Sequence, residues 1–317
     1  MPHLKIGDKQ LEYVWHGPRP DEAPAEGPTL IFLHEGLGCV AMWRDFPERL
    51  AEATGCGALV YSRAGYGNSD SCDLPRAVRF MHDEALVTLP RVLDAFQIRK
   101  AILVGHSDGG SIALIHAGGI FNHEDTKSTK TEESKRTSRS LSTKTLIGGL
   151  ILEAPHVFVE EIGLESIRAI AEEYRTAIVN VPSSERASPE RDAGRMPASR
   201  PQDAGAPEGV PSVLKQRLAR YHGENVDATF GGWNDVWLNP RFQSWNIEEY
   251  LPQIQIPVLL IQGEDDRYGT LAQVKAIEAG CQGPVRTELL ADCGHSPHLD
   301  QPARALEAMR EFGAELK

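Results

Sequence analysis

An apolar run leads directly into a Gly-x-Ser-x-Gly turn, and this junction constrains the fold more than any other part of the sequence. The run covers residues 101–105, the turn places Ser107 between Gly105 and Gly109, and a helix-like segment follows at residues 111–117. So tight a strand-to-helix turn leaves no room for a Cβ atom two positions on either side of the serine. The serine hydroxyl then stands at the N-terminus of a helix, whose unpaired N–H groups favour an anion. We therefore expect a nucleophilic serine here; the alternative is a glycine-rich turn with an incidental serine.

Further short apolar runs recur along the chain and are separated by segments of helical length. These runs cover residues 29–33, 58–62, 149–152, 258–261 and 285–290, and the run before the serine turn is the sixth. Runs that are apolar on both faces and alternate with helices indicate a mostly parallel sheet with helices on both sides, so the sequence predicts an α/β fold. One helix is expected at residues 301–315. Another should be capped by Asp73, extend to Leu93 and bend at Pro90.

Composition and charge exclude several classes of protein. Of the 317 residues, 41% are apolar, which is enough to bury a sizeable core. The formal net charge of -12 argues against nucleic acid or an anionic membrane as the main partner. No stretch approaches the ~18 consecutive apolar residues of a membrane-spanning helix, and the first residues lack the apolar core of a signal peptide. The five cysteines are scattered without a Cys-x-x-Cys pair, so we expect a cytoplasmic protein with reduced thiols.

Two polar segments interrupt the α/β pattern. In residues 124–145, half of the positions are Ser or Thr and nearly all others are charged, and residues 183–212 carry five prolines among Arg, Asp, Gly and Ala. Segments with so few apolar side chains cannot offset the entropy that is lost on ordering. We therefore predict that both segments are disordered insertions.

A serine hydroxyl is a weak nucleophile at neutral pH and needs a base that is itself oriented by a carboxylate. The run 258–261 is followed by a loop that contains Asp265 and Asp266, either of which could point a carboxylate into a cleft. After the last apolar run, Gly294 gives the backbone freedom to present His295. The three groups would then follow one another along the chain in the order Ser, Asp, His.

With these motifs, the sequence resembles the α/β-hydrolase superfamily over nearly the whole chain outside the two polar segments. The family's Gly-x-x-Asp element corresponds to residues 263–266, which makes Asp266 the implied acid, ahead of the carboxylate that precedes it. The family's Gly-His-x-x-His-Leu-x-x-Pro ending corresponds to residues 294–302, which makes His295 the implied base and His298 a structural or rim residue. The resemblance implies a mostly parallel twisted sheet flanked by helices, with an inserted helical cap.

Residues 34–38 resemble the oxyanion turn His-Gly-Gly-Pro-Gly of proline iminopeptidase-like members of this superfamily, with departures at Glu35 and Leu37. The resemblance implies that the backbone N–H groups of Gly36 or Leu37, and of Asp108, point at the oxyanion that forms during acyl transfer. An ionised Glu35 carboxylate would oppose a nearby anion. This side chain is therefore expected either to turn outward or to bind an amine on the substrate.

Several further polar residues are interpreted as structural. Residues 61–69 match the family's loop after the next strand, where Arg63 and Ser69 are expected to fasten loops beneath the oxyanion turn. His106 and His116 are expected to pack locally.

The family inserts its cap over the active site, and residues 155–250 fit such a cap, with helical patterns at residues 165–179 and 213–221. The α/β core then comprises residues 1–154 and 251–317. An apolar cap favours an acyl or aryl group over a sugar or phosphate. The residues expected to line the substrate pocket are His156, Phe158, Trp233, Trp237 and Trp245.

The sequence thus predicts a serine hydrolase, without cofactor or metal, that cleaves a small or medium apolar carboxylic ester or related acyl compound through Ser107, His295 and Asp266. A serine rather than an aspartate at the turn separates the chain from haloalkane dehalogenases and epoxide hydrolases of the same fold. A zinc site at Cys293, His295 and His298 would lack a further ligand pair. The alternatives are a cofactor-free C–C hydrolase, a perhydrolase or haloperoxidase, and a non-catalytic protein that binds a small ligand. The expected partner is a small acyl substrate, and the sequence does not decide between monomer and homodimer.

Overall fold

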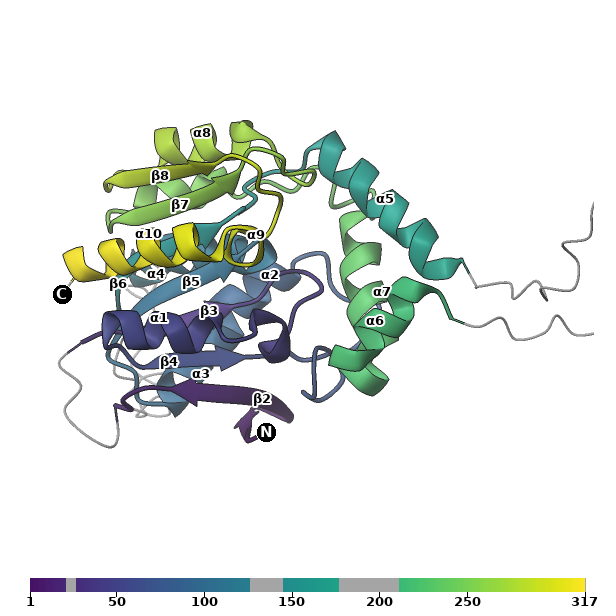
Figure 1. Ribbon diagram of the computed structural model, residues 1–317, viewed down its shortest axis with the longest axis horizontal. Helices are drawn as coiled ribbons and strands as arrows, with labels where there is room; N and C mark the ends of the chain where they lie inside the picture. Colours follow the sequence, from purple (N-terminus) through teal and green to yellow (C-terminus); the bar gives the residue numbers. More distant parts are fainter. Residues whose placement is uncertain (21–26, 126–144, 177–210, 317) are drawn as a thin grey trace, which may run out of the picture.

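One eight-stranded sheet forms the centre of the molecule (Figure 1). The computed structural model describes residues 1–20, 27–125, 145–176 and 211–316. The strands lie side by side in the order β1-β2-β4-β3-β5-β6-β7-β8. The pairs β1-β2 and β2-β4 are antiparallel, and the remaining pairs are parallel. The strands are β1 (His3–Ile6), β2 (Lys9–His16), β3 (Thr29–Leu33), β4 (Ala58–Tyr61), β5 (Lys100–His106), β6 (Leu146–Glu153), β7 (Val258–Gly263) and β8 (Val285–Leu290).

The six strands that the apolar runs predict are all present, as β3 to β8. The sequence reasoning missed β1 and β2, which lie at one edge of the sheet and mix charged with apolar residues. Gly7, with a φ of 63°, turns the chain between these two strands. Tyr13 of β2 then pairs with Tyr61 of β4 and joins the hairpin to the parallel part of the sheet.

Helices cover both faces of the sheet. On one face lie α1 (Phe46–Thr54) and α10 (Pro302–Glu315), and on the other lie α2 (Phe80–Asp83), α3 (Leu89–Ala95), α4 (Asp108–Asp125) and α8 (Leu271–Gly280). Successive residues of a strand point to opposite faces of the sheet. In β3, Leu30 and Phe32 therefore pack with α1 and α10, whereas Ile31 and Leu33 pack with the helices on the other face. No described helix combines the length and the apolar character that a bilayer crossing demands.

The helix expected after Asp73 begins later and is interrupted. Asp73 is exposed and caps no helix, because α2 begins only at Phe80. A π-helical turn at Glu84–Thr88 separates α2 from α3, and Pro90 lies in the first turn of α3, where its missing N–H is tolerated. The expected cap at Asp73 is therefore wrong, and the helix at residues 301–315 is confirmed. The bend expected at Pro90 remains a prediction, although the helix is interrupted just before this residue.

Three described α-helices between β6 and β7 lie beside the carboxyl ends of the parallel strands, at the right of Figure 1. We call them the cap helices; they are α5 (Glu161–Arg175), α6 (Val213–His222) and α7 (Val226–Trp237). The helices expected at residues 165–179 and 213–221 correspond to α5 and α6, although the last residues of the first lie outside the described part. The sequence reasoning missed α7, which contains the weak helix formers Gly231 and Gly232.

Most of the two polar segments lies outside the described residues, which omit 126–144 and 177–210. At the margin of the first, α4 extends to Asp125. At the margin of the second, Ser212 is buried as the N-cap of α6, where its Oγ accepts a hydrogen bond from Lys215 N at 3.1 Å. Ser212 is thus part of the folded structure rather than of an insertion. The boundaries between core and cap remain a prediction.

Two glycines allow β3, β5 and α4 to approach one another at the Ser107 turn. A Cβ atom on Gly105 would lie 2.5 Å from Gly109 O, and a Cβ atom on Gly109 would collide with Leu33 O. The atoms that would be struck belong to the backbone, which cannot swing aside as a flexible side chain can. The glycines therefore hold the end of β3 against the turn that follows β5.

We expect Gly109→Ala to lower the free energy of unfolding by at least about 2 kcal/mol, because the methyl group overpacks a backbone contact. The measurement is urea unfolding followed by circular dichroism. Gly148→Ala is the matched control, since a Cβ there would meet only Ala101 O at 3.8 Å. Its effect should stay within about 0.5 kcal/mol. Equal stability of the two variants would contradict the close contact at Gly109.

Candidate active site

The Ser107 turn has the backbone geometry that the sequence predicts. Ser107 has a φ of 53°, a left-handed conformation that is uncommon outside glycine and asparagine and indicates local strain. Its N–H donates to Glu153 O of β6 at 2.9 Å, and its carbonyl accepts from Gly110 N at 2.8 Å and Ser111 N at 3.1 Å. These bonds tie the residue to a neighbouring strand and to the first turn of α4. The side chain is thus held where β5 ends and α4 begins.

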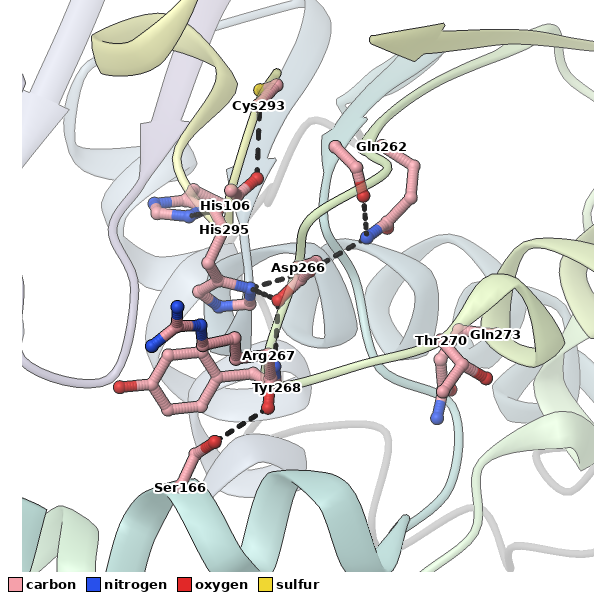
Figure 2. A network of polar contacts seen from close by, with 12 residues as sticks. His106, Ser166, Gln262, Asp266, Arg267, Tyr268, Thr270, Gln273, Cys293 and His295 are labelled. Atoms are coloured by element: carbon pink, nitrogen blue, oxygen red, sulfur yellow. Dashed lines mark hydrogen bonds and ion pairs between the residues drawn. The ribbon is translucent and has the colours of Figure 1, made fainter. Parts of the chain in front are cut away.

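His295 and Asp266 are in direct contact at the carboxyl ends of β7 and β8 (Figure 2). His295 Nδ1 lies 2.9 Å from each carboxylate oxygen of Asp266. Asp266 also accepts hydrogen bonds from Tyr268 N at 2.8 Å and from Gln262 Nε2 at 2.7 Å. Asp265 is exposed and makes no such contact. Of the two candidate acids, Asp266 is therefore the one that contacts the imidazole.

The surroundings of Asp266 favour its ionised form. Burial alone would raise the pKa of this carboxyl group, but the hydrogen bond and charge of His295, with the donors on Tyr268 and Gln262, outweigh it and lower the pKa to about 2. An ionised Asp266 orients the ring so that Nδ1 carries the proton towards it. The Nε2 atom of His295 then remains as the basic nitrogen.

Ser107 and His295 line the same cavity, which has a volume of about 270 Å³. Within the described residues they form no hydrogen bond to each other. Contacts between a nucleophile and its base are often long in the absence of substrate and tighten when substrate binds. The arrangement brings together the three residues that the sequence predicts as nucleophile, base and acid.

The turn after β3 offers one candidate oxyanion donor rather than two. Leu37 N donates to Glu35 Oε2 at 2.5 Å, so this N–H is already occupied. The N–H groups of Gly36 and Asp108 donate to no acceptor among the described residues, and both residues line the cavity. A side chain at position 36 would collide with the indole of Trp233, which explains why glycine stands there. Of the three residues expected at the oxyanion site, Gly36 and Asp108 therefore keep an N–H group without an acceptor among the described residues, whereas the N–H of Leu37 is occupied.

The Glu35 side chain does not turn outward. It folds back onto Leu37 N and lines the cavity beside the Ser107 turn. Burial raises the pKa of this carboxyl group, an effect that the Leu37 hydrogen bond and the nearby His295 charge only partly offset. The cavity therefore holds a carboxyl group whose charged form is disfavoured.

Arg63 and Ser69 have the structural roles expected of them. Arg63 is buried and donates from Nη1 to His34 O at 2.6 Å and from Nη2 to Glu35 O at 2.9 Å, which fastens the turn after β3 from below. Ser69 Oγ donates to Ser62 O at 2.7 Å within the loop after β4. Neither residue lines the cavity.

A second histidine–carboxylate pair lies behind the first. His298 Nδ1 is 2.7 Å from Glu153 Oε2, and both side chains are almost fully buried. His106 Nε2 forms a hydrogen bond of 2.7 Å with His295 O, so it supports the backbone of the candidate base. The sequence reasoning anticipated structural roles for His298 and His106 but missed Glu153. The one sequence feature that points to Glu153 is its position at the end of a strand beside the serine turn.

Apolar side chains from the cap helices form the roof of the cavity. Of the residues expected to line it, His156, Trp233 and Trp237 do so. Phe158 does not line the cavity; it forms an isolated β-bridge with Asn246. Trp245 does not line the cavity either, because its ring stacks on Phe242 with ring centroids 5.1 Å apart. The sequence reasoning missed six cap residues that line the cavity: Gly163, Ile167, Leu214, Arg217, Leu218 and Tyr221. The four that belong to α6 recur at helical spacing on one face of that helix, a signal that could have identified them.

Another histidine that lines the cavity is held neutral. Burial, together with the nearby His295, lowers the pKa of His156 to about 3. Its backbone carbonyl accepts a hydrogen bond of 2.6 Å from Ser111 Oγ, which anchors it to α4. In the part of the chain that the structure describes, no cluster of three or more His, Cys, Asp or Glu side chains is arranged to hold a metal ion.

The fold, the strained serine turn and the carboxylate-bound histidine together define an α/β-hydrolase-type site. A sequence profile described as "Alpha/beta hydrolase family" matches residues 30–308, and the chain belongs to this family.

Individual relatives agree on the fold. A proline iminopeptidase of Lactobacillus delbrueckii subsp. lactis is 23% identical over 312 residues, which cover 98% of this chain and 96% of that protein. Among solved structures, an esterase from Exiguobacterium antarcticum superposes with a TM-score of 0.63 at 17% identity over 99% of both chains. A proline iminopeptidase from Mycobacterium smegmatis superposes with a TM-score of 0.60 at 18% identity over 99% of this chain and 97% of that one.

We expect Glu35→Gln to stabilise the protein more at high pH than at low pH. Below about pH 4.3 a glutamate is protonated in the folded and the unfolded chain, so the exchange changes little there. As the pH rises, the unfolded chain ionises first, because the pKa of the partly buried Glu35 is raised, and wild type loses stability relative to the variant. Thermal unfolding measured between about pH 4 and pH 8 reports the difference in Tm. A Tm difference that is constant with pH, or equal to that of the exposed control Glu52→Gln, would contradict the burial of the Glu35 charge.

Proposed function

We propose that the protein is a serine hydrolase that cleaves a small or medium-sized apolar carboxylic ester, or a related acyl compound, through an acyl-enzyme. The observation that carries this proposal is the contact between His295 Nδ1 and Asp266 at 2.9 Å, in a site where His295 and Ser107 line one cavity. A nucleophile, a base and an orienting carboxylate are the groups that acyl transfer by serine requires.

In the proposed mechanism, Ser107 Oγ attacks the carbonyl carbon of the substrate while His295 Nε2 accepts the hydroxyl proton. Asp266 keeps the imidazole in the required tautomer and stabilises its protonated form. The N–H groups of Gly36 and Asp108 donate to the tetrahedral oxyanion. His295 then returns the proton to the leaving group, and a water molecule, activated by the same imidazole, hydrolyses the acyl-enzyme.

The lining of the cavity supports an apolar acyl group. Its roof consists largely of aliphatic and aromatic side chains from α5, α6 and α7, and its volume of about 270 Å³ suits a small or medium-sized group. The names of the similar proteins, an esterase and proline iminopeptidases, are names of hydrolases, which agrees with acyl-bond cleavage.

We expect Ser107→Ala to lower kcat for p-nitrophenyl butyrate by at least about 1000-fold, because the nucleophile is lost while the cavity remains. The measurement is release of p-nitrophenolate under saturating substrate. Ser71→Ala, at an exposed serine that does not line the cavity, should keep wild-type turnover. Wild-type turnover by Ser107→Ala would refute the proposed nucleophile.

Asp266→Asn should lower kcat by roughly 1000- to 10,000-fold, because an amide can hold the imidazole in the wrong tautomer and cannot stabilise its charge. Asp265→Asn is the matched control: it makes the same chemical change one residue earlier, on an exposed side chain. Steady-state kinetics on the same ester compare the two variants. Equal losses in both, or a larger loss in Asp265→Asn, would show that Asp266 is not the acid.

A further inference from the structure

Asp108 carries two groups that matter at the site. Its backbone N–H is a proposed oxyanion donor, and its side chain is fully buried beside the cavity. One carboxylate oxygen, Oδ1, accepts a hydrogen bond of 3.2 Å from Trp237 Nε1. The other oxygen, Oδ2, has no hydrogen-bond partner among the described residues. The direct tether that holds this buried side chain is therefore an indole N–H.

Trp237 reaches Asp108 from the cap. It is the last residue of α7, and its ring is buried against Phe242 and Trp245, with centroid distances of 5.0 Å and 5.9 Å. On the other side, the ring meets that of His156 at 5.4 Å and 70°. The His156 ring in turn lies 5.6 Å from the ring of His295. Trp237 thus contacts Asp108, the proposed oxyanion donor, directly. It reaches His295, the proposed base, only through the ring of His156.

The charge on Asp108 makes this tether energetically important. Burial, and to a lesser extent the Glu35 charge, raise the pKa of the carboxyl group. Arg63, the Trp237 hydrogen bond and Arg76 oppose the rise, and the resulting pKa is about 6. The group is therefore largely ionised at neutral pH. A buried carboxylate with one of its two oxygens unpaired depends strongly on its remaining donor, since charge-assisted hydrogen bonds are about twice as strong as neutral ones.

We infer that Trp237 is a positioning residue for the hydrolytic reaction: its indole N–H holds the Asp108 side chain and so fixes the Asp108 backbone N–H that faces the oxyanion. The inference rests on the proposed function. Oxyanion donors act only when they point at the place where the charge develops, so a small displacement of residue 108 weakens the transition state more than the bound substrate. The packing of α7 against the core and the geometry of the oxyanion site are then coupled through one hydrogen bond.

The test is Trp237→Phe, which keeps a buried ring but removes the N–H donor. We expect kcat for p-nitrophenyl butyrate to fall by about 10-fold while KM stays within about twofold. Binding of a trifluoromethyl ketone, which forms a tetrahedral oxyanion adduct with serine, should weaken by the same factor as kcat/KM. A ketone without fluorine, which stays trigonal, should bind as before. A change confined to KM would overturn the inference.

Trp245→Phe is the matched control. Trp245 is also a buried tryptophan of the same aromatic cluster, but its Nε1 has no partner among the described residues and it does not line the cavity. This variant should keep the wild-type kcat. An equal loss of kcat in both variants would mean that ring packing, rather than the N–H, is responsible, and would contradict the inference.

A double-mutant cycle isolates the pair. If Trp237 acts through the Asp108 carboxylate, Trp237→Phe should cost little further kcat once Asp108→Ala has removed the acceptor. Losses that multiply in the double variant would show that the two residues act independently, and would overturn the inference.

A readout that does not depend on turnover separates this inference from the proposed function. The indole N–H signal that disappears from the NMR spectrum of Trp237→Phe should shift with pH in wild type, with a midpoint of about 6, and should stop titrating in Asp108→Asn. An active enzyme whose indole signal does not titrate would overturn the inference. A titrating indole in a protein that hydrolyses no ester would overturn the proposed function, and with it the catalytic part of the inference.

Discussion

The backbone contact between the end of β3 and the Ser107 turn is the constraint on which the candidate site depends. Gly109 lies against Leu33 O so closely that no side chain fits, and a Cβ atom on Gly105 would lie 2.5 Å from Gly109 O. Because of this contact, the loop that carries Gly36 stands beside the turn that carries Ser107. The proposed nucleophile and both proposed oxyanion donors therefore come from two adjacent strand ends. Because β6, β7 and β8 run parallel to β5, their carboxyl ends lie at the same end of the sheet.

The parallel strands and the loops that follow them could be predicted from sequence for a physical reason. Strands buried on both faces are continuous apolar runs, and Thr29–Leu33 and Val258–Gly263 are buried at every position. The residues that follow parallel strands lie together at the carboxyl end of the sheet. Ser107, Asp266 and His295 could therefore be located there without coordinates. β1 and β2 were not predicted, because edge strands mix polar with apolar residues. The helix expected after Asp73 was placed too early, because a capping residue type does not by itself start a helix.

Other features of the site could not be predicted, because they depend on contacts between distant parts of the chain. Trp237 and Asp108 are 129 residues apart, and His298 and Glu153 are 145 apart. The orientation of Glu35 is set by the hydrogen bond that its carboxylate accepts from Leu37 N and by Arg63, which holds the backbone carbonyl of Glu35 itself. Whether an aromatic ring of the cap faces the cavity also follows from tertiary packing. This explains why Trp237 lines the cavity whereas Trp245, eight residues later, stacks on Phe242 outside it.

The central claim is that Ser107 is made nucleophilic by His295, and covalent trapping tests it most directly. The protein would be treated with diethyl p-nitrophenyl phosphate, a compound that phosphorylates activated serines, and the adduct located by peptide mass spectrometry. The account predicts one adduct, on the peptide that contains Ser107, and a loss of nearly all labelling in His295→Ala. An adduct on another residue, or labelling of Ser107 at an unchanged rate in His295→Ala, would contradict it.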